Sequence, residues 1–273
     1  MLSAVTLDPA KPEAAAAAVL EAWNRALIVH LQAAGPIRDV RATFDALLPF
    51  IGTPRPLAED VRAGGREAQR TGQLWSEVRF DPSFPDAYRH SKNAQPLHID
   101  GSYVAALPNA ALMCCVQNAA RGGETVFISG DDLVAALHDE RPDLLEALTG
   151  TPMPHERSGD RRVRPVIRRQ GDEWLLNWNY YCVSKECGPK VMALREAFFS
   201  FLRDSKRVRE ALVEVKLKPG DGVVWKDERV LHGRNAFLAN EIAEVTRGQL
   251  AINLGREIWP SQQLCGAVAV LHW

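Results

Sequence analysis

The chain has 273 residues, of which 46% are hydrophobic and 25% charged, and its formal net charge at pH 7 is −1. This length and apolar content suffice for one sizeable core, so we expect a single domain over residues 1–273. Because acidic and basic side chains are mixed along the chain and nearly cancel, the composition argues against nucleic acid or a membrane surface as a partner.

The cysteines and the N-terminus indicate a cytoplasmic protein. The five cysteines form neither a CxxC motif nor a paired framework, and they are Cys114, Cys115, Cys182, Cys187 and Cys265. An odd number in a chain of this length is typical of reduced thiols. The first residues hold no basic stretch followed by an apolar segment, and no later run approaches the length of a membrane span.

Helices are predicted ahead of residue 51. Residues 12–34 are rich in Ala and Leu, and their larger apolar side chains recur at the spacing of one helix face. A second helix is predicted over 40–48, before the breaker sequence of residues 52–56. Residues 57–73 contain two adjacent glycines and few apolar anchors, which indicates a loop, either a mobile flap over a site or a solvated connection.

From residue 74 onward the pattern changes to short strands with helices between them. Strands are predicted over 75–80, 97–100, 110–116, 125–128, 213–217, 223–226 and 249–254, and a hairpin over 161–169 and 173–180. Helices are predicted from a cap at Asp131 or Asp132 to Leu137, and over 142–150 and 190–203. This order favours a mainly β fold with helical additions, a double-stranded β-helix or jelly roll. It would carry N-terminal helices at about 12–50 and a helical or lid insertion at about 131–212.

Three residues have side chains and spacing suited to one metal ion. Residues i and i+2 of a strand point to the same face, so His98 and Asp100 can grip an ion from one side. His232, far downstream in Val-Leu-His-Gly-Arg, would complete a facial triad that leaves three positions open on iron(II). Taken alone, a His-x-Asp pair is common enough to arise by chance, and His232 taken alone would be interpreted as an ordinary turn residue. The surrounding sequence must therefore decide whether these residues form a metal site.

Two blocks of sequence surround these residues. The first runs from Gln95 through Gln-Pro-Leu-His-Ile-Asp-Gly-Ser-Tyr to Gly-Gly-Glu-Thr, which ends at Thr125. The second holds His232 and then Arg247, followed by Gly-Gln-Leu-Ala-Ile-Asn-Leu. In order and spacing the chain resembles the taurine dioxygenase superfamily, the 2-oxoglutarate-dependent oxygenases that include clavaminate synthase and related hydroxylases. The resemblance covers about residue 74 to the C-terminus and is strongest over 95–130 and 222–255.

The resemblance implies a role for each matching residue. His98, Asp100 and His232 would be the iron ligands, with no catalytic residue beyond the metal centre. Thr125 would donate a hydrogen bond to a carboxylate of 2-oxoglutarate. Arg247 would pair with the cosubstrate, since a planar guanidinium binds a carboxylate through two parallel charge-assisted hydrogen bonds. Arg234 and Arg256 are rivals for the role of Arg247.

The resemblance also implies an activity. The chain would be an Fe(II)/2-oxoglutarate-dependent dioxygenase that uses O2 to hydroxylate an unactivated C–H bond of a small polar metabolite, an amino acid or a carboxylate. 2-Oxoglutarate would be decarboxylated to succinate and CO2. Because the carboxylate of Asp100 is retained, hydroxylation or desaturation is expected and halogenation is not. A sulfonate-releasing dioxygenase and a catalytically silent jelly-roll protein that binds a metal or ligand remain alternatives.

Substrate contacts are the least determined part of the sequence. Tyr103, Asn179 and Arg234 are candidates because they lie beside motif residues or in the aromatic run 174–181. A group of arginines would either receive an anionic substrate or form the solvated face of a hairpin: Arg157, Arg161, Arg162, Arg164, Arg168 and Arg169. Since alternate residues of a strand face opposite sides, at most half of them can point inward.

Overall fold

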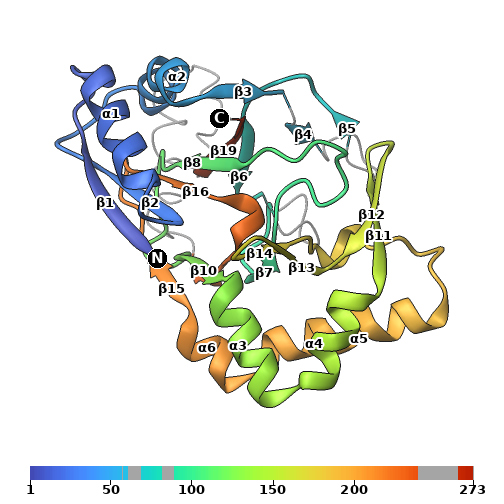
Figure 1. The fold of residues 1–273 in the computed structure, drawn as a ribbon. Helices are drawn as coiled ribbons and strands as arrows, with labels where there is room; N and C mark the ends of the chain where they lie inside the picture. The colour runs from blue at the N-terminus through green and yellow to red at the C-terminus, as the bar shows by residue number, and fades with distance from the viewer. Residues whose placement is uncertain (57, 61–68, 82–88, 239–263, 273) are drawn as a thin grey trace.

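The computed structural model describes the chain apart from residues 57, 61–68, 82–88, 239–263 and 273, and at 60, 69 and 264–272 it describes the backbone alone. Two sheets lie face to face between two sets of helices (Figure 1). None of the described helices is both long and apolar enough to cross a bilayer. The four side-chain-resolved cysteines, at 114, 115, 182 and 187, form no disulfide.

The larger sheet has seven strands in the order β1-β2-β16-β8-β19-β3, with β6 also paired to β19. Its strands are β1 (Leu2–Leu7), β2 (Ile28–Ala33), β3 (Thr53–Arg55), β6 (Ser76–Arg79), β8 (Ala110–Cys114), β16 (Gly222–Trp225) and β19 (Leu264–His272). The β1 and β2 strands are parallel, and every other pair in the sheet is antiparallel. The helices α1 (Pro12–Trp23) and α2 (Val40–Ile51) pack on its outer face.

The smaller sheet has four strands in the order β15-β10-β17-β7. They are β15 (Val213–Val215), β10 (Thr125–Ser129), β17 (Val230–Arg234) and β7 (Gln95–His98). All the pairs are antiparallel, and His232 of β17 lies opposite His98 of β7 in the register. This sheet therefore brings together two segments that are far apart in the sequence.

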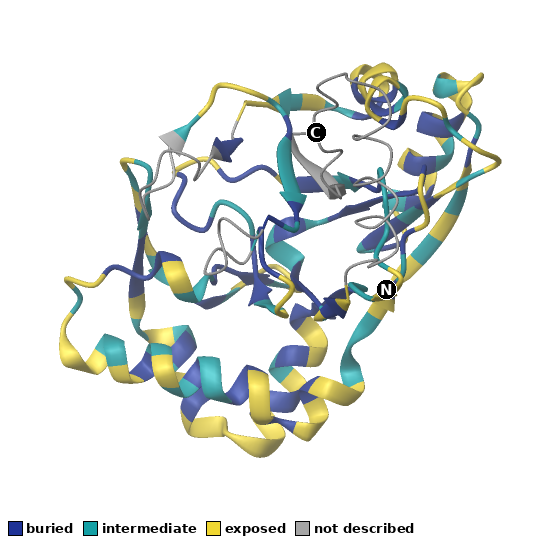
Figure 2. Ribbon diagram, turned by 180° about the vertical axis from the view of Figure 1, so that it is seen from behind, coloured by how far each residue is buried: buried dark blue, intermediate teal, exposed yellow. Residues whose placement is uncertain are grey.

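Alternation along the strands divides the core into layers. On β16, Val223 and Trp225 point toward the smaller sheet, where Trp225 meets Phe127 of β10 with ring centroids 5.6 Å apart. Val224 points the other way, into the layer beneath α1 and α2. The outer face of β10 packs on the C-terminal helices α3 (Gly130–Glu140), α4 (Pro142–Gly150), α5 (Pro189–Asp204) and α6 (Lys206–Ala211). Figure 2 shows that these helices are buried on the side toward the sheet and exposed on the other.

The predicted helix over 12–34 is wrong in its second half. The helix α1 ends at Trp23, and residues 28–33 form β2, a central strand between β1 and β16. Alanines favour helix, but Ile28, Val29 and Leu31 are fully buried between neighbours on both sides, and that packing outweighs local propensity. The strand β1 was also not predicted.

Later elements agree better with prediction. The helix α4 spans 142–150 as predicted, and α5 extends the predicted 190–203 by one residue at each end. Ser129, and neither of the two aspartates, caps α3, with Oγ accepting from the Asp132 amide at 3.0 Å. The predicted hairpin is divided between two: β11 (Pro152–Arg157) with β12 (Asp160–Pro165), and β13 (Ile167–Gln170) with β14 (Glu173–Leu176). The predicted strand 249–254 lies outside the described residues.

Short elements complete the arrangement: β4 (Glu59–Asp60) with β5 (Gln69–Arg70), β9 (Arg121–Gly122) with β18 (Phe237–Leu238), and the 3-10 turns η1 (Tyr180–Cys182) and η2 (Asp227–Arg229). The result is a mixed α/β structure with more helix than the mainly β prediction implied. Among the strands that the structure describes, the two sheets share no hydrogen-bonded pair and form no closed barrel.

Candidate metal centre

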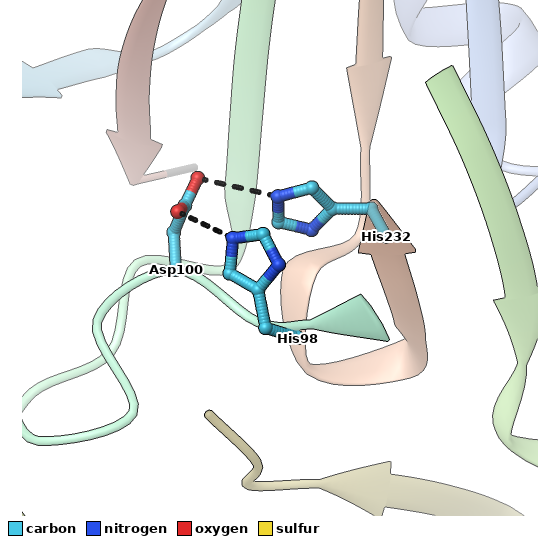
Figure 3. A group of neighbouring side chains, drawn as sticks. All are labelled: His98, Asp100 and His232. Carbon is cyan, nitrogen blue, oxygen red and sulfur yellow. Dashed lines mark ion pairs between the residues drawn. The ribbon is translucent and has the colours of Figure 1, made fainter. Parts of the chain in front are cut away.

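The side chains of His98, Asp100 and His232 converge between the two sheets (Figure 3). His98 is the last residue of β7, Asp100 lies in the turn that follows, and His232 is in the middle of β17. The sequence placed Asp100 within a strand, whereas the strand ends two residues earlier. The turn nevertheless keeps its carboxylate on the same side as the His98 ring.

The three side chains are close enough to share one ion. One atom from each lies within 4.8 Å of the others. The carboxylate of Asp100 is 3.8 Å from Nε2 of His98 through Oδ1 and 3.8 Å from Nε2 of His232 through Oδ2. Both histidines are buried, while the side chain of Asp100 is 31% exposed. The cluster is thus open on the carboxylate side.

The backbone fixes which nitrogen of His98 faces the cluster. Its Nδ1 lies 2.8 Å from the carbonyl oxygen of Pro96, which can only accept, so Nδ1 carries the proton. The Nε2 lone pair is then directed at the centre, which is the tautomer a metal ligand needs. The side-chain amide of Gln95 is 3.3 Å from this Nε2.

A second, fully buried carboxylate lies beside His232. Asp227, in η2, has Oδ1 3.7 Å from Nδ1 of His232. The same oxygen accepts from the indole of Trp225 at 3.1 Å and from the amide of Asp100 at 3.3 Å. Burial raises the pKa of Asp227 well above its usual value, and the charge of Asp100 adds to this. Burial, and then the neighbouring His98, lower the pKa of His232, so its ring is neutral.

These groups fit a divalent cation. Two imidazoles present Nε2 and one carboxylate presents its oxygens from the same side, which is the donor set of a two-histidine, one-carboxylate site. Nδ1 of His232 and Oδ2 of Asp227 are buried without a hydrogen-bond partner. A cation on Nε2 of His232 would keep the proton on Nδ1, where it faces Asp227.

The other predicted site residues are placed as follows. Thr125 is buried on β10, opposite Arg234 and two residues from Phe127, which is opposite His232; its side chain is therefore on the same face of the sheet as His232. Arg234 donates from Nη2 to the carbonyl oxygens of Ser91 and Asn93 at 2.8 and 2.9 Å. Arg247 and its rival Arg256 lie outside the described residues.

The two remaining substrate candidates have specific partners. Tyr103 donates its hydroxyl to Glu59 Oε1 at 2.5 Å. Asn179 caps η1, with its side-chain Oδ1 accepting from the backbone N–H of Tyr181 at 3.2 Å. The backbone N–H of Asn179 donates to Nε2 of His155 at 3.4 Å. The roles predicted for Thr125, Arg247, Tyr103, Asn179 and Arg234 stay predictions.

The arginines of the hairpins divide between surface and interior. Arg162 and Arg168 point inward and share the carboxylate of Glu228, at 3.5 and 3.0 Å. Arg161 and Arg169 are largely exposed, as alternation along a strand requires. Arg157 forms an ion pair with Glu59, which belongs to β4 and to neither hairpin.

Sequence reasoning missed Asp227, Gln95 and Glu59 as members of this region. Asp227 precedes His232 by five residues and follows Trp225, but nothing local indicates that it would reach the amide of Asp100. Gln95 was quoted only as the start of the first block. Glu59 was assigned to a loop, and the residues that contact its carboxylate are more than forty positions away in the sequence.

Comparison with known proteins agrees with this geometry. A family model described as taurine catabolism dioxygenase TauD, TfdA family, matches residues 3–249. A uridine-5'-phosphate dioxygenase from Amycolatopsis sp is 25% identical over 179 residues, 60% of this chain and 62% of that protein. The mitochondrial trimethyllysine dioxygenase of Gallus gallus is 27% identical over 179 residues, 61% of this chain and 42% of that protein. The aligned part is thus less than two thirds of these relatives.

Solved structures share the fold. An asparagine oxygenase in complex with Fe(II), 2S,3S-3-hydroxyasparagine and succinate superposes with a TM-score of 0.65 at 13% identity, covering 98% of this chain and 93% of that one. The family model covers most of the present chain, including all three side chains of the cluster. The chain therefore belongs to the TauD, TfdA family of Fe(II)/2-oxoglutarate-dependent dioxygenases.

Proposed function

We propose that the chain hydroxylates an unactivated C–H bond of a small polar metabolite, an amino acid or another carboxylate, and converts 2-oxoglutarate and O2 to succinate and CO2. The observation that carries this proposal is the convergence of His98, Asp100 and His232 in a chain of this family. Retention of all three groups, with Nδ1 of His98 facing the carbonyl oxygen of Pro96, supports an enzyme over a silent binding protein.

Each residue of the centre has a defined part in this function. His98, Asp100 and His232 hold iron(II) from one side and leave positions for 2-oxoglutarate and O2. When bound, these groups supply the oxidising chemistry that side chains lack. Retention of the Asp100 carboxylate supports hydroxylation or desaturation, since halogenation needs that position for a halide. Thr125 and Arg247 are proposed to hold the carboxylates of 2-oxoglutarate.

The preference for amino acids is supported by the names of similar proteins. The trimethyllysine dioxygenase and the asparagine oxygenase are named for amino acids, although the second comparison, at 13% identity, concerns the fold alone. We further propose that the two sheets are the two halves of a jelly roll within one domain over 1–273, with residues 131–212 as its insertion. A cytoplasmic location stays a prediction.

The test begins with the cofactors. Anaerobic addition of iron(II) and 2-oxoglutarate to the protein should give the weak violet colour of a chelated keto acid. Asp100→Ala should lose both this colour and substrate-dependent succinate formation, because one of three ligands is removed. Wild type is then exposed to O2 with a panel of amino acids, sulfonates and sugar acids, and succinate is measured. If wild type shows no colour, the protein is a catalytically silent binding protein and the proposed enzyme activity is rejected. If succinate forms with sulfonates alone, the activity is that of a sulfonate-releasing dioxygenase.

A further inference from the structure

A buried carboxylate with arginines around it lies close to the metal centre in the fold. Glu59, in β4, is 4% exposed in its side chain and meets residues from three other segments. Tyr103 comes from the turn after Asp100, Arg157 from the end of β11, and Arg89 from the segment between β6 and β7. We call Glu59, Arg89, Tyr103 and Arg157 the Glu59 cluster. Figure 1 shows β4 on the same side of the molecule as β11 and β12.

The carboxylate of Glu59 is fully used within the protein. Its Oε1 accepts from the hydroxyl of Tyr103 at 2.5 Å and from Oγ of Ser158 at 3.0 Å. Its Oε2 accepts from Nε of Arg157 at 2.6 Å. Burial, with the charge of Glu59, raises the pKa of Tyr103, so the phenol stays protonated and donates. Glu59 thus fixes the orientation of Arg157 by its Nε, the edge of the guanidinium nearest the stem.

The cluster has more positive than negative charge. Arg89 donates Nη1 to the backbone carbonyl of Glu59, which carries no charge. Burial lowers the pKa of Arg89, and the charge of Arg157 lowers it further, as expected for two guanidinium groups near each other. Glu59 offsets one of these two charges, and the carboxylate of Asp100, which also acts on Arg89, belongs to the metal centre. Arg70 approaches the ring of Tyr103, at 6.0 Å, but is paired with Asp160 and adds nothing to the balance.

An excess positive charge in a largely buried place is costly unless an anion pairs with it. Arg157 is the member that an external group can reach, because its side chain is 29% exposed while Glu59 is not. The pairing with Glu59 uses Nε, and the guanidinium also interacts with the thiol of Cys182. Its two NH2 groups carry four N–H donors in all, enough to bind a carboxylate as well. Among the described residues, the cluster therefore has the charge and the donors for one anionic group.

The Glu59 cluster lies near the proposed iron ligands, which suits it to hold a substrate there. Tyr103 is three residues after Asp100, in a tight turn where the Val104 amide donates to the Gly101 carbonyl at 2.9 Å. The charge of Asp100 also raises the pKa of Arg89, so this guanidinium is within electrostatic range of the Asp100 side of the centre. That is the side on which the metal cluster is open, since Asp100 is its most exposed member.

We propose that Arg157, held by Glu59 and supported by Arg89, binds a carboxylate of the substrate, so that the substrate is an amino acid or small carboxylate anchored by this group beside the iron. The proposal rests on the proposed function and adds the anchoring residue to it. In this proposal Tyr103, which the sequence predicts as a direct substrate contact, has the additional role of holding Glu59. Arg157 thereby determines specificity for an acid over its uncharged amide.

The test separates the anchor from the metal centre. Wild type, Arg157→Gln, Arg157→Lys and the control Arg161→Gln are loaded anaerobically with iron(II) and 2-oxoglutarate. Arg161 is the control because it lies in the neighbouring strand β12 with its side chain 60% exposed. All four should develop the keto-acid absorption band, and the perturbation of that band is titrated with the twenty L-amino acids, small carboxylates, and the primary amides of any that bind.

We expect wild type and Arg161→Gln to bind an acid at least about tenfold more tightly than its amide. Arg157→Gln should weaken binding of the acid by about 100-fold, the loss of two charge-assisted hydrogen bonds, and bind acid and amide alike. Arg157→Lys should recover part of the affinity because it keeps the charge. This recovery would not follow if the glutamine variant merely misfolded, and band formation in each variant reports the fold independently.

Three results overturn the proposal while leaving the proposed function intact, because the band still forms: Arg157→Gln binds the acid as wild type does, wild type binds acid and amide equally, or no carboxylate in the panel perturbs the band. If Arg157→Gln loses the band itself, the residue acts on the metal centre or the fold and the anchor is rejected. Absence of the band in wild type overturns the proposed function as well.

Discussion

Replacing Asp227 with Asn should weaken iron binding although Asp227 is not a ligand. The substitution keeps the shape of the side chain and its acceptor for the Trp225 indole and the Asp100 amide. It removes the carboxyl group whose Oδ1 lies 3.7 Å from Nδ1 of His232, and whose ionised form a cation bound at the centre would favour over the neutral form that burial favours. When a cation holds Nε2, the proton on Nδ1 faces this carboxylate. Closing the present 3.7 Å separation would give a hydrogen bond to a charged group, which contributes about 1.5 to 3 kcal/mol.

That free energy sets the expected size of the effect. Loss of the partner of a metal-ligating histidine weakens metal binding by about 10- to 100-fold, and each tenfold change is about 1.4 kcal/mol. The two figures agree, so Asp227→Asn should raise the dissociation constant for iron(II) by about 10- to 100-fold. Because Asn keeps the two hydrogen bonds that the Asp227 Oδ1 accepts, most of the loss should appear in metal affinity.

The assay is an anaerobic titration with iron(II), repeated with cobalt(II), whose absorption spectrum reports the ligand field directly. The matched control is Asp221→Asn. Asp221 is also a buried carboxylate, but it accepts from the amides of Ala33 and Lys218 and lies 3.2 Å from His30, away from the cluster. Its loss should lower the free energy of unfolding and leave the metal affinity and cobalt spectrum unchanged.

Two results would refute the reasoning. Iron affinity within twofold of wild type in Asp227→Asn would mean that the carboxylate does not interact with the His232 proton. Equal losses of affinity in Asp227→Asn and Asp221→Asn would mean that both act through general stability. In either case the buried carboxylate beside His232 would need another explanation.

Three further predictions concern the packing around the centre and the stability of the fold. Gly233→Ala should destabilise the protein by about 1 to 3 kcal/mol and weaken iron binding, because its Cβ would lie 2.6 Å from the Gln95 carbonyl oxygen on β7; Gly150→Ala, with nothing within 4 Å, should not. Burial lowers the pKa of His155 from 6.5 to about 4, so the unfolded chain takes up a proton first as pH falls. The free energy of unfolding should therefore fall by about 3 kcal/mol as the pH is lowered from 6.5 to 4. In His155→Gln, urea unfolding should show a weaker dependence of this free energy on pH. Ser129→Ala should cost about 1 kcal/mol in the same assay by removing the cap of α3. A pH slope unchanged in His155→Gln, or unfolding midpoints unchanged in the other two, would contradict these expectations.

The sequence predicted correctly those helices and strands whose boundaries are marked by their own residues. The helix α4 begins at a proline and ends at a glycine, and both boundaries were predicted. The strand β2 was not, because its Ala-rich neighbourhood favours helix and its strand conformation depends on β1 and β16 on either side. Two hairpins were merged into one because Val166, fully buried, interrupts an otherwise continuous strand pattern.

The candidate site divides in the same way. His98 and Asp100 were predicted from their spacing, and His232 from the resemblance of its surroundings. The residues around them were not predicted. Asp227 contacts Asp100, and nearby Glu59 contacts Arg157, only because the fold brings together positions that are 127 and 98 residues apart in the sequence. A motif indicates which groups bind a metal, whereas what orients them depends on contacts that no spacing encodes.

One contact connects the two sheets to the metal centre. Trp225 ends β16 of the larger sheet and packs on Phe127 of the smaller one. Its indole holds Asp227, and the same carboxylate oxygen holds the amide of Asp100 and faces His232. The separation of the three candidate ligands therefore depends on the spacing between the sheets as well as on either strand. Because cores are closely packed and resist changes of volume, this arrangement preorganises the ligands through hydrophobic packing, with a single buried carboxylate transmitting it to both sides of the site.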